Sequence, residues 1–139
     1  FARHDAATLS ANLDVRPEEL QAYRARGGKI LSYFGWADAV IAPELGLQWY
    51  RSVERHATGP GKTADFYRLF MVPGMLHCQG GAGAVNFGQS IDAPPRIARP
   101  AYDVRLALER WVEHGRPPRT LESDDGMSHT RLRPVASAP

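Results

Sequence analysis

The stretch Phe66-Tyr67-Arg68-Leu69-Phe70-Met71-Val72 is a mostly apolar run of strand length that ends at Pro73-Gly74. A second run of the same kind, Lys29-Ile30-Leu31-Ser32-Tyr33-Phe34, lies earlier in the chain. Neither run shows the regular alternation of apolar and polar residues expected of a strand with one wet face. Continuous apolar runs are typical of strands buried on both faces of a sheet, so the two runs are predicted to be core strands.

Helices are predicted before, between and after these strands. The first runs from Pro17 to Arg26, because a proline and two glutamates suit a first turn and Gly27-Gly28 ends it. The second begins at Pro43 and ends at the Gly- and Pro-rich break 57–61, and the third ends at Gly115. Their apolar stripes are Leu45, Trp49 and Val53 in the second helix, and Val104, Leu108, Trp111 and Val112 in the third. Segments 80–100 and 116–139 are predicted to be irregular.

Alternating helices and strands predict an α/β fold with parallel strands joined by crossover helices. Two strands are too few for a complete parallel sheet, which needs more neighbours and cover on both faces. The chain also begins without an initiator methionine. We therefore expect residues 1–139 to be part of one larger domain, with the other strands of its sheet preceding Phe1.

Composition narrows the functional class. With 139 residues and 43% hydrophobic residues, the chain has enough apolar material for one core. A formal net charge of +2 is too even a balance to favour a nucleic-acid surface. No run approaches the ~20 apolar residues of a membrane-spanning helix, and the N-terminus lacks the layout of a signal peptide. Neither nucleic acid nor a membrane is expected as a partner.

Two chemically active side chains follow the predicted strands. Asp38 lies in the loop after the first strand, and His77 lies in the loop after the second. The carboxyl ends of parallel strands share one rim of a sheet, so neighbouring strands would bring these side chains together. A carboxylate beside an imidazole fixes its tautomer and lets it act as a base, as in a serine hydrolase.

The nucleophile of such a site is missing from the chain. Hydrolases with an α/β core place nucleophile, acid and histidine in that order, and Asp38 before His77 satisfies the last two positions. No serine lies in a Gly-x-Ser-x-Gly turn between a strand and a helix; the serines are Ser10, Ser32, Ser52, Ser90, Ser123, Ser128 and Ser137. The chain is predicted to supply the acid and the base only.

Simpler interpretations exist for the same residues. Asp38 would serve equally as a helix cap, His77 as a surface histidine and Cys78 as a small buried hydrophobe. Trp36 fits either a loop support or a pocket wall. The His-Cys pair lacks a second ligand pair at zinc spacing, so no metal site is predicted.

Two tryptophans, four histidines and six arginines are predicted to lie in the core or on the solvated surface, without a role in the site. Trp49 and Trp111 lie on helix stripes and are predicted to be core. The remaining histidines are predicted to be solvated: His4, His56, His114 and His129. The same holds for a set of arginines: Arg96, Arg99, Arg116, Arg119, Arg131 and Arg133.

The motif Gly35-Trp36-Ala37-Asp38 and the longer motif from Phe66 to Gly81, which contains Pro73-Gly74-Met75-Leu76-His77-Cys78, closely resemble the tannase and feruloyl esterase family. The segment Trp111-Val112-Glu113-His114-Gly115-Arg116-Pro117-Pro118 is similar to the end of its final helix. The resemblance covers roughly residues 12–120. Members usually have histidine where this chain has Phe34, and often a cysteine where it has Val135-Ala136.

The resemblance implies the C-terminal portion of an α/β-hydrolase fold. It makes Asp38 the acid of a Ser-His-Asp triad, His77 its base, and Cys78 one half of a disulfide to an upstream cysteine beside the serine. It places the serine, the oxyanion donors and a lid domain, which often binds calcium, upstream of this chain. No cofactor is expected in the chain itself. It implies a secreted or periplasmic enzyme acting on esters of aromatic acids.

The leading hypothesis is therefore carboxylic ester hydrolysis by an acyl-enzyme route in a longer protein, with this fragment inactive alone. The alternative hypothesis is a stand-alone binding or scaffold domain that keeps hydrolase-like motifs without their chemistry.

Overall fold

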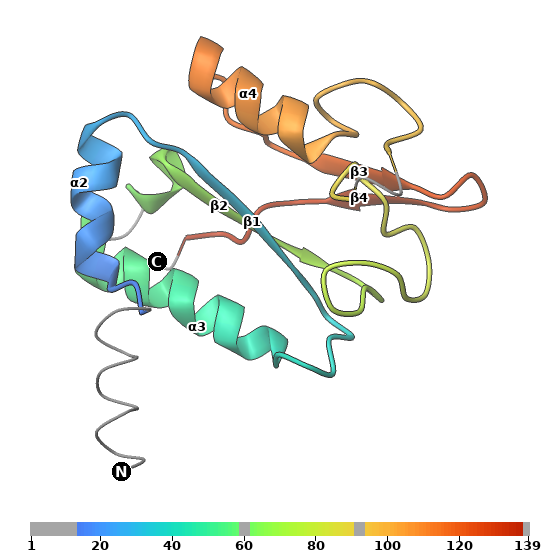
Figure 1. The fold of residues 1–139 in the computed structure, drawn as a ribbon, viewed down its shortest axis with the longest axis horizontal. Coiled ribbons are helices and arrows are strands. Elements are labelled where there is room, and N and C mark those ends of the chain that lie inside the picture. Colours follow the sequence, from blue (N-terminus) through green and yellow to red (C-terminus); the bar gives the residue numbers. More distant parts are fainter. Residues whose placement is uncertain (1–13, 59–61, 91–93, 138–139) are drawn as a thin grey trace.

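The core of the chain is a pair of parallel strands. The computed structural model describes residues 14–58, 62–90 and 94–137 (Figure 1). In it β1 (Ile30–Gly35) lies parallel to β2 (Tyr67–Val72), with Ile30 opposite Tyr67 and Gly35 opposite Val72. Both predicted strands and their parallel pairing are confirmed, and each begins one residue later than predicted. The predicted α/β class, with parallel strands and helices, agrees with this arrangement.

The three predicted helices are also present. The first is a 3-10 turn, η1 (Pro17–Glu19), followed by α2 (Leu20–Ala25). The second, α3 (Pro43–Val53), continues into one π-helical turn, η2 (Glu54–Thr58), and a 3-10 turn, η3 (Thr63–Asp65), precedes β2. The third is α4 (Val104–His114), which ends at Gly115 with a left-handed φ of 63°. None of the described helices is long and apolar enough to cross a membrane.

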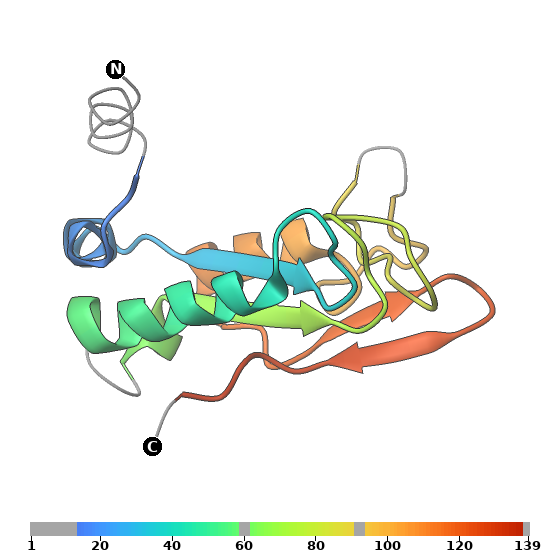
Figure 2. The ribbon, with the colours of Figure 1, turned by 90° about the horizontal axis from the view of Figure 1, so that it is seen from below.

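The two faces of the strand pair pack against different elements (Figure 2). Successive side chains of a strand point to opposite faces. From β2, Phe70 and Val72 enter a cluster with Ala107 of α4, whereas Tyr67 and Leu69 enter one with residues of α3. The strands are thus covered on both sides, as their apolar sequences predicted.

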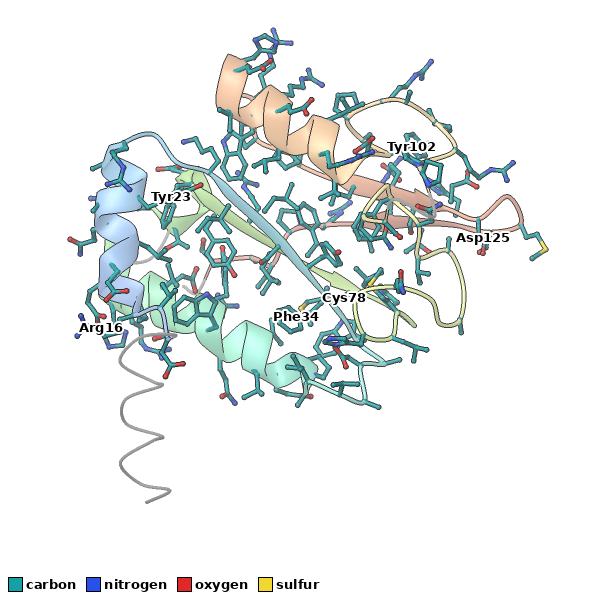
Figure 3. All side chains as sticks on the ribbon, in the orientation of Figure 1. Arg16, Tyr23, Phe34, Cys78, Tyr102 and Asp125 are labelled. Carbon is teal, nitrogen blue, oxygen red and sulfur yellow. The ribbon has the colours of Figure 1, made fainter. Side chains whose placement is uncertain are left out.

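Some of the residues predicted to form the buried faces of the second and third helices are exposed. In α3, Leu45 is 54% exposed, and the buried positions are Pro43, Gly46, Tyr50 and Val53. The reason is the ring of Phe34, which lies against Gly46 so closely that a β-carbon there would come within 2.6 Å of it. Figure 3 shows Phe34 between β1 and α3. In α4, Val112 is 59% exposed, and Ala107 and Trp111 form the buried face.

The end of the chain is not irregular, contrary to the prediction for 116–139. β3 (Leu121–Asp124) and β4 (His129–Leu132) form an antiparallel hairpin. The chain then runs along β2, where the Val135 amide donates to the Leu69 carbonyl at 2.7 Å. This segment covers one edge of β2, while the outer edge of β1 has no strand partner among the described residues.

Candidate active site

The loop that carries Asp38 is tied to the loop that carries His77 through their backbones. Beyond the end of β1, the Trp36 amide donates to the Val72 carbonyl at 2.9 Å, and the Ala37 amide donates to the Met75 carbonyl at 3.0 Å. The two loops therefore leave the same end of the strand pair side by side, as the parallel order predicted.

The His77 loop is closed into a compact hairpin. Met75 and Gly81 form an isolated antiparallel bridge, and the Leu76 amide donates to the Gly80 carbonyl at 3.0 Å. Gly74 has a left-handed φ of 72°, and a β-carbon on it would lie 2.1 Å from the Ala82 carbonyl oxygen. Only glycine fits such a position, and the tight closure holds His77 near the hairpin tip.

Asp38 and His77 meet at this end of the sheet. The Nδ1 atom of His77 lies 2.9 Å from Oδ2 of Asp38. The aspartate side chain is 3% exposed, whereas the histidine side chain is 44% exposed. The acid is thus shielded behind the imidazole, and the imidazole remains open on its other side.

Asp38 is held as a carboxylate. Its Oδ1 accepts hydrogen bonds from the Val40 amide at 2.8 Å and the Ile41 amide at 3.0 Å. The Ile41 amide lowers the pKa of Asp38 most, and the His77 and Val40 hydrogen bonds lower it further against the opposing effect of burial. An ionised carboxylate only accepts hydrogen bonds, so His77 donates from Nδ1, and the neutral imidazole with this tautomer has Nε2 as its acceptor.

The amides of Val40 and Ile41 were not singled out from the sequence. They make Asp38 the acceptor of a turn that precedes α3, not the cap of that helix, whose N-cap is Ala42 without a side-chain hydrogen bond; the helix-cap interpretation was therefore wrong, and the second carboxylate oxygen binds His77. One carboxylate therefore closes the turn with Oδ1 and binds His77 with Oδ2. An aspartate shortly before a helix-starting proline, here Pro43, was the available signal for the turn.

Three of the described serines make hydrogen bonds to residues other than His77. Ser123 donates its hydroxyl to the Ala84 carbonyl at 2.6 Å, and Ser128 donates to Asp125. Ser32 donates to the Tyr67 hydroxyl on the strand pair. Ser10 lies outside the described residues.

Two further residues of the predicted site flank the histidine and the acid. Cys78 is exposed and unbridged, and it is a non-glycine residue in the left-handed region, with a φ of 65° (labelled in Figure 3). Trp36 is 46% exposed, so its indole is not buried as a support for the loop. Both side chains are accessible beside the histidine loop and the acid loop.

Large apolar side chains are exposed around this pair of loops. We call them the apolar rim, and its members are Trp36, Val40, Ile41, Leu45 and Leu76, each between 40% and 74% exposed. They come from the Asp38 loop, the first turn of α3 and the residue before His77. Several large apolar side chains exposed on neighbouring loops are typical of ligand sites and interfaces.

The remaining candidates lie away from the pair. Trp111 is 2% exposed and Trp49 packs against the core, so both are core residues as predicted. His56 and His114 are exposed, and His4 lies outside the described residues. His129 is exposed as predicted, and its Nε2 also lies 2.9 Å from Glu122 Oε2.

The six arginines predicted to be solvated are all exposed, and two of them also form ion pairs. Arg131 donates to the buried Glu122 at 2.8 Å, and Arg96 lies 3.7 Å from Asp124, so these two are paired. The other four appear in none of the ion pairs formed within the described residues: Arg99, Arg116, Arg119 and Arg133. No three His, Cys, Asp or Glu side chains within 14–58, 62–90 and 94–137 are grouped to hold a metal ion.

The chain is similar to known esterases over most of its length. It is 33% identical to an uncharacterized esterase of Xanthomonas campestris pv. campestris, covering 94% of this chain and 26% of that protein. It is 38% identical to feruloyl esterase C of Talaromyces stipitatus, covering 82% of this chain and 24% of the relative.

The chain is also similar to solved structures of esterases. Feruloyl esterase B from Aspergillus oryzae superposes with a TM-score of 0.74 at 30% identity, covering 86% of this chain and 24% of that one. The chain therefore spans about a quarter of the length of these relatives. The sequence profile described as tannase and feruloyl esterase matches residues 2–139, and the chain belongs to this family.

Proposed function

We propose that the chain is the C-terminal part of the catalytic domain of a serine-type carboxylic ester hydrolase, to which it contributes Asp38 as acid and His77 as base. The observation that carries the proposal is the 2.9 Å contact between His77 Nδ1 and Asp38 Oδ2. Family membership supports the reaction class, and the geometry supports the roles of the two residues.

In the proposed mechanism, a serine from the remainder of the protein faces Nε2 of His77. Nε2 takes the hydroxyl proton as the serine oxygen attacks the ester carbonyl carbon, and it then gives that proton to the departing alcohol. In the second half of the reaction, Nε2 takes a proton from water as the water oxygen attacks the acyl-enzyme. It then gives that proton to the serine oxygen as the acid product leaves. Asp38 keeps the imidazole oriented and stabilises its positive charge, which its lowered pKa suits because the carboxylate stays ionised.

The remainder of the protein is also proposed to complete the sheet. The outer edge of β1 offers backbone hydrogen-bonding groups that have no strand partner among the described residues. Unpaired edges of apolar strands are normally covered or paired. A strand added there would extend the parallel sheet, as an α/β-hydrolase fold requires. It would run beside β1, whose C-terminal end leads into the Asp38 loop.

Cys78 is proposed to form a disulfide with a cysteine in that remainder. It is exposed, lies directly after the base, and sits on a loop whose closure fixes its position. A bridge from Cys78 would tie the histidine loop to the segment that approaches His77. Such a bridge fits an oxidising compartment, in keeping with a secreted or periplasmic enzyme.

The proposed substrates are esters of aromatic acids. Trp36, Ile41 and Leu76 of the apolar rim are exposed beside the acid and the base, where they would contact a flat apolar acyl group. The feruloyl esterases among the relatives support this class. Any calcium would belong to the upstream lid.

The test is hydrolysis of methyl ferulate and methyl gallate by the protein at its full native length. Asp38→Asn is expected to lower kcat by about 10³–10⁴-fold, because the imidazole loses the partner that fixes its tautomer. The matched control is Asp125→Asn, since Asp125 lies in the turn between β3 and β4, bonded to Ser128. Its kcat should be unchanged.

Two outcomes would contradict the proposal. An Asp38→Asn variant with normal kcat would remove the site assignment. A native protein that cleaves neither ester would favour the alternative of a binding or scaffold domain. The present chain alone is expected to be inactive, because it lacks the nucleophile.

A further inference from the structure

A groove of about 500 Å³ lies on α4, lined by residues that follow the helix and residues that precede it. Its floor is apolar, since the lining residues Ala107 and Pro118 are buried and Pro100, Ala101 and Pro117 are partly buried. In Figure 1 α4 lies across the molecule from α3, the helix that follows the Asp38 loop. The groove shares no lining residue with the proposed active site.

Three exposed arginines line the groove: Arg110, Arg116 and Arg119. No acidic residue is among the lining residues. None of the ion pairs formed within the described ranges involves these three side chains. Glu109 and Glu113 of α4 are exposed and do not line the groove.

Two further cations, from the residue before β1 and from β2, lie against Trp111 of α4. The Lys29 ammonium and the Arg68 guanidinium lie over the ring of Trp111, 5.6 and 5.8 Å from its centroid. The opposing contributions are the exposed carboxylates of Glu109 and Glu113 and the C-terminal end of α4 at Gly115, which carries about half an elementary negative charge. The charged residues that line the groove itself are all cationic, and like charges gathered there repel one another until an anion is present.

We infer that this groove binds a small organic carboxylate with a flat apolar body. Guanidinium groups pair with carboxylates through two parallel hydrogen bonds, which suits an anion held at the arginine-lined rim. The apolar floor provides contact for a ring or short hydrocarbon body, as in small-molecule sites generally. A purely inorganic anion would leave this floor unused. The inference does not depend on the chemistry proposed for Asp38 and His77.

The test is calorimetric titration of the protein at its full native length, at low ionic strength, with benzoate, acetate and inorganic phosphate. Benzoate is expected to bind more tightly than acetate and phosphate. The triple variant R110Q/R116Q/R119Q should weaken benzoate binding by about tenfold or more. A control with the same change of charge is R55Q/R99Q/R133Q, in exposed arginines that do not line the groove, and it should bind as the native protein does.

A second control separates this groove from the proposed active site. His77→Ala should leave benzoate binding unchanged, even if it abolishes hydrolysis. Loss of binding in His77→Ala but not in the arginine variant would overturn the inference, and so would phosphate binding as tight as benzoate binding. If the triple variant does not fold, Arg116→Gln and Arg119→Gln are titrated separately, and unaltered benzoate affinity in both would also overturn it.

Discussion

Gly35, the last residue of β1, lies directly against the backbone of Met75. A β-carbon built on Gly35 would come within 2.1 Å of the Met75 carbonyl oxygen and 2.5 Å of the Leu76 carbonyl oxygen. Its φ is not left-handed, so the requirement for glycine here is one of space. Because Leu76 immediately precedes His77, this close approach sets the distance at which the imidazole meets Asp38.

Replacing Gly35 with alanine should therefore displace the His77 loop. We expect kcat for methyl ferulate to fall by about 10²-fold with a smaller change in KM, since a misplacement of about 1 Å is enough for such a loss. Overpacking at this position should also lower the free energy of unfolding by about 1–3 kcal/mol. Steady-state kinetics and urea unfolding measure the two effects.

The control for Gly35→Ala is Gly115→Ala. Gly115 has a left-handed φ of 63°, and a β-carbon there would meet no atom within 4 Å. This variant should lose about 1 kcal/mol of stability through backbone strain alone and keep its kcat. Normal kcat in Gly35→Ala would show that the close approach does not position the histidine.

Replacing Trp36 with alanine should change substrate preference. Trp36 is 46% exposed in the apolar rim, so an aromatic acyl group would lose a contact surface that an acetyl group does not reach. We expect kcat/KM for methyl ferulate to fall about tenfold while kcat/KM for methyl acetate stays nearly constant. Val112→Ala, at a 59% exposed position on α4, is the control. Equal losses for both esters would exclude a substrate contact by Trp36.

The lowered pKa of Asp38 predicts a pH dependence of stability. The ordinary value for this carboxyl is 3.8, and the folded protein holds it lower, chiefly through the Ile41 amide. The ionised group therefore stabilises the fold above about pH 4, and this contribution is lost as the pH falls through the folded pKa. Melting temperatures of the native protein and Asp38→Asn should differ most above about pH 4 and converge as the pH falls below the folded pKa. A difference independent of pH would contradict this interpretation.

The strands and the meeting of Asp38 with His77 were predictable because their signals are local. Two apolar runs of strand length specify buried parallel strands, and each is followed at once by a loop with one reactive side chain. Parallel order alone then brings the loops to one end of the sheet. The register in which Gly35 faces Val72 could not be predicted in this way, since it depends on contacts between the strands.

The hairpin of β3 and β4 could not be recognised for a physical reason. Each strand has four residues and carries polar side chains that are stabilised only by tertiary partners. Ser123, for example, is fully buried and bonded to the Ala84 carbonyl, far away in sequence. The buried face of α3 was misassigned for a similar reason, because Gly46 has no side chain to signal that Phe34 packs on it.

The most direct test of the account asks whether Asp38 and His77 act as one unit. In a double-mutant cycle on the full-length protein, His77→Ala should remove most of the kcat for methyl ferulate. Adding Asp38→Asn should then lower it by no more than about threefold, because the carboxylate acts only through the imidazole. If the two losses instead multiply as independent factors, the carboxylate does not work through His77 and the proposed catalytic pair is wrong.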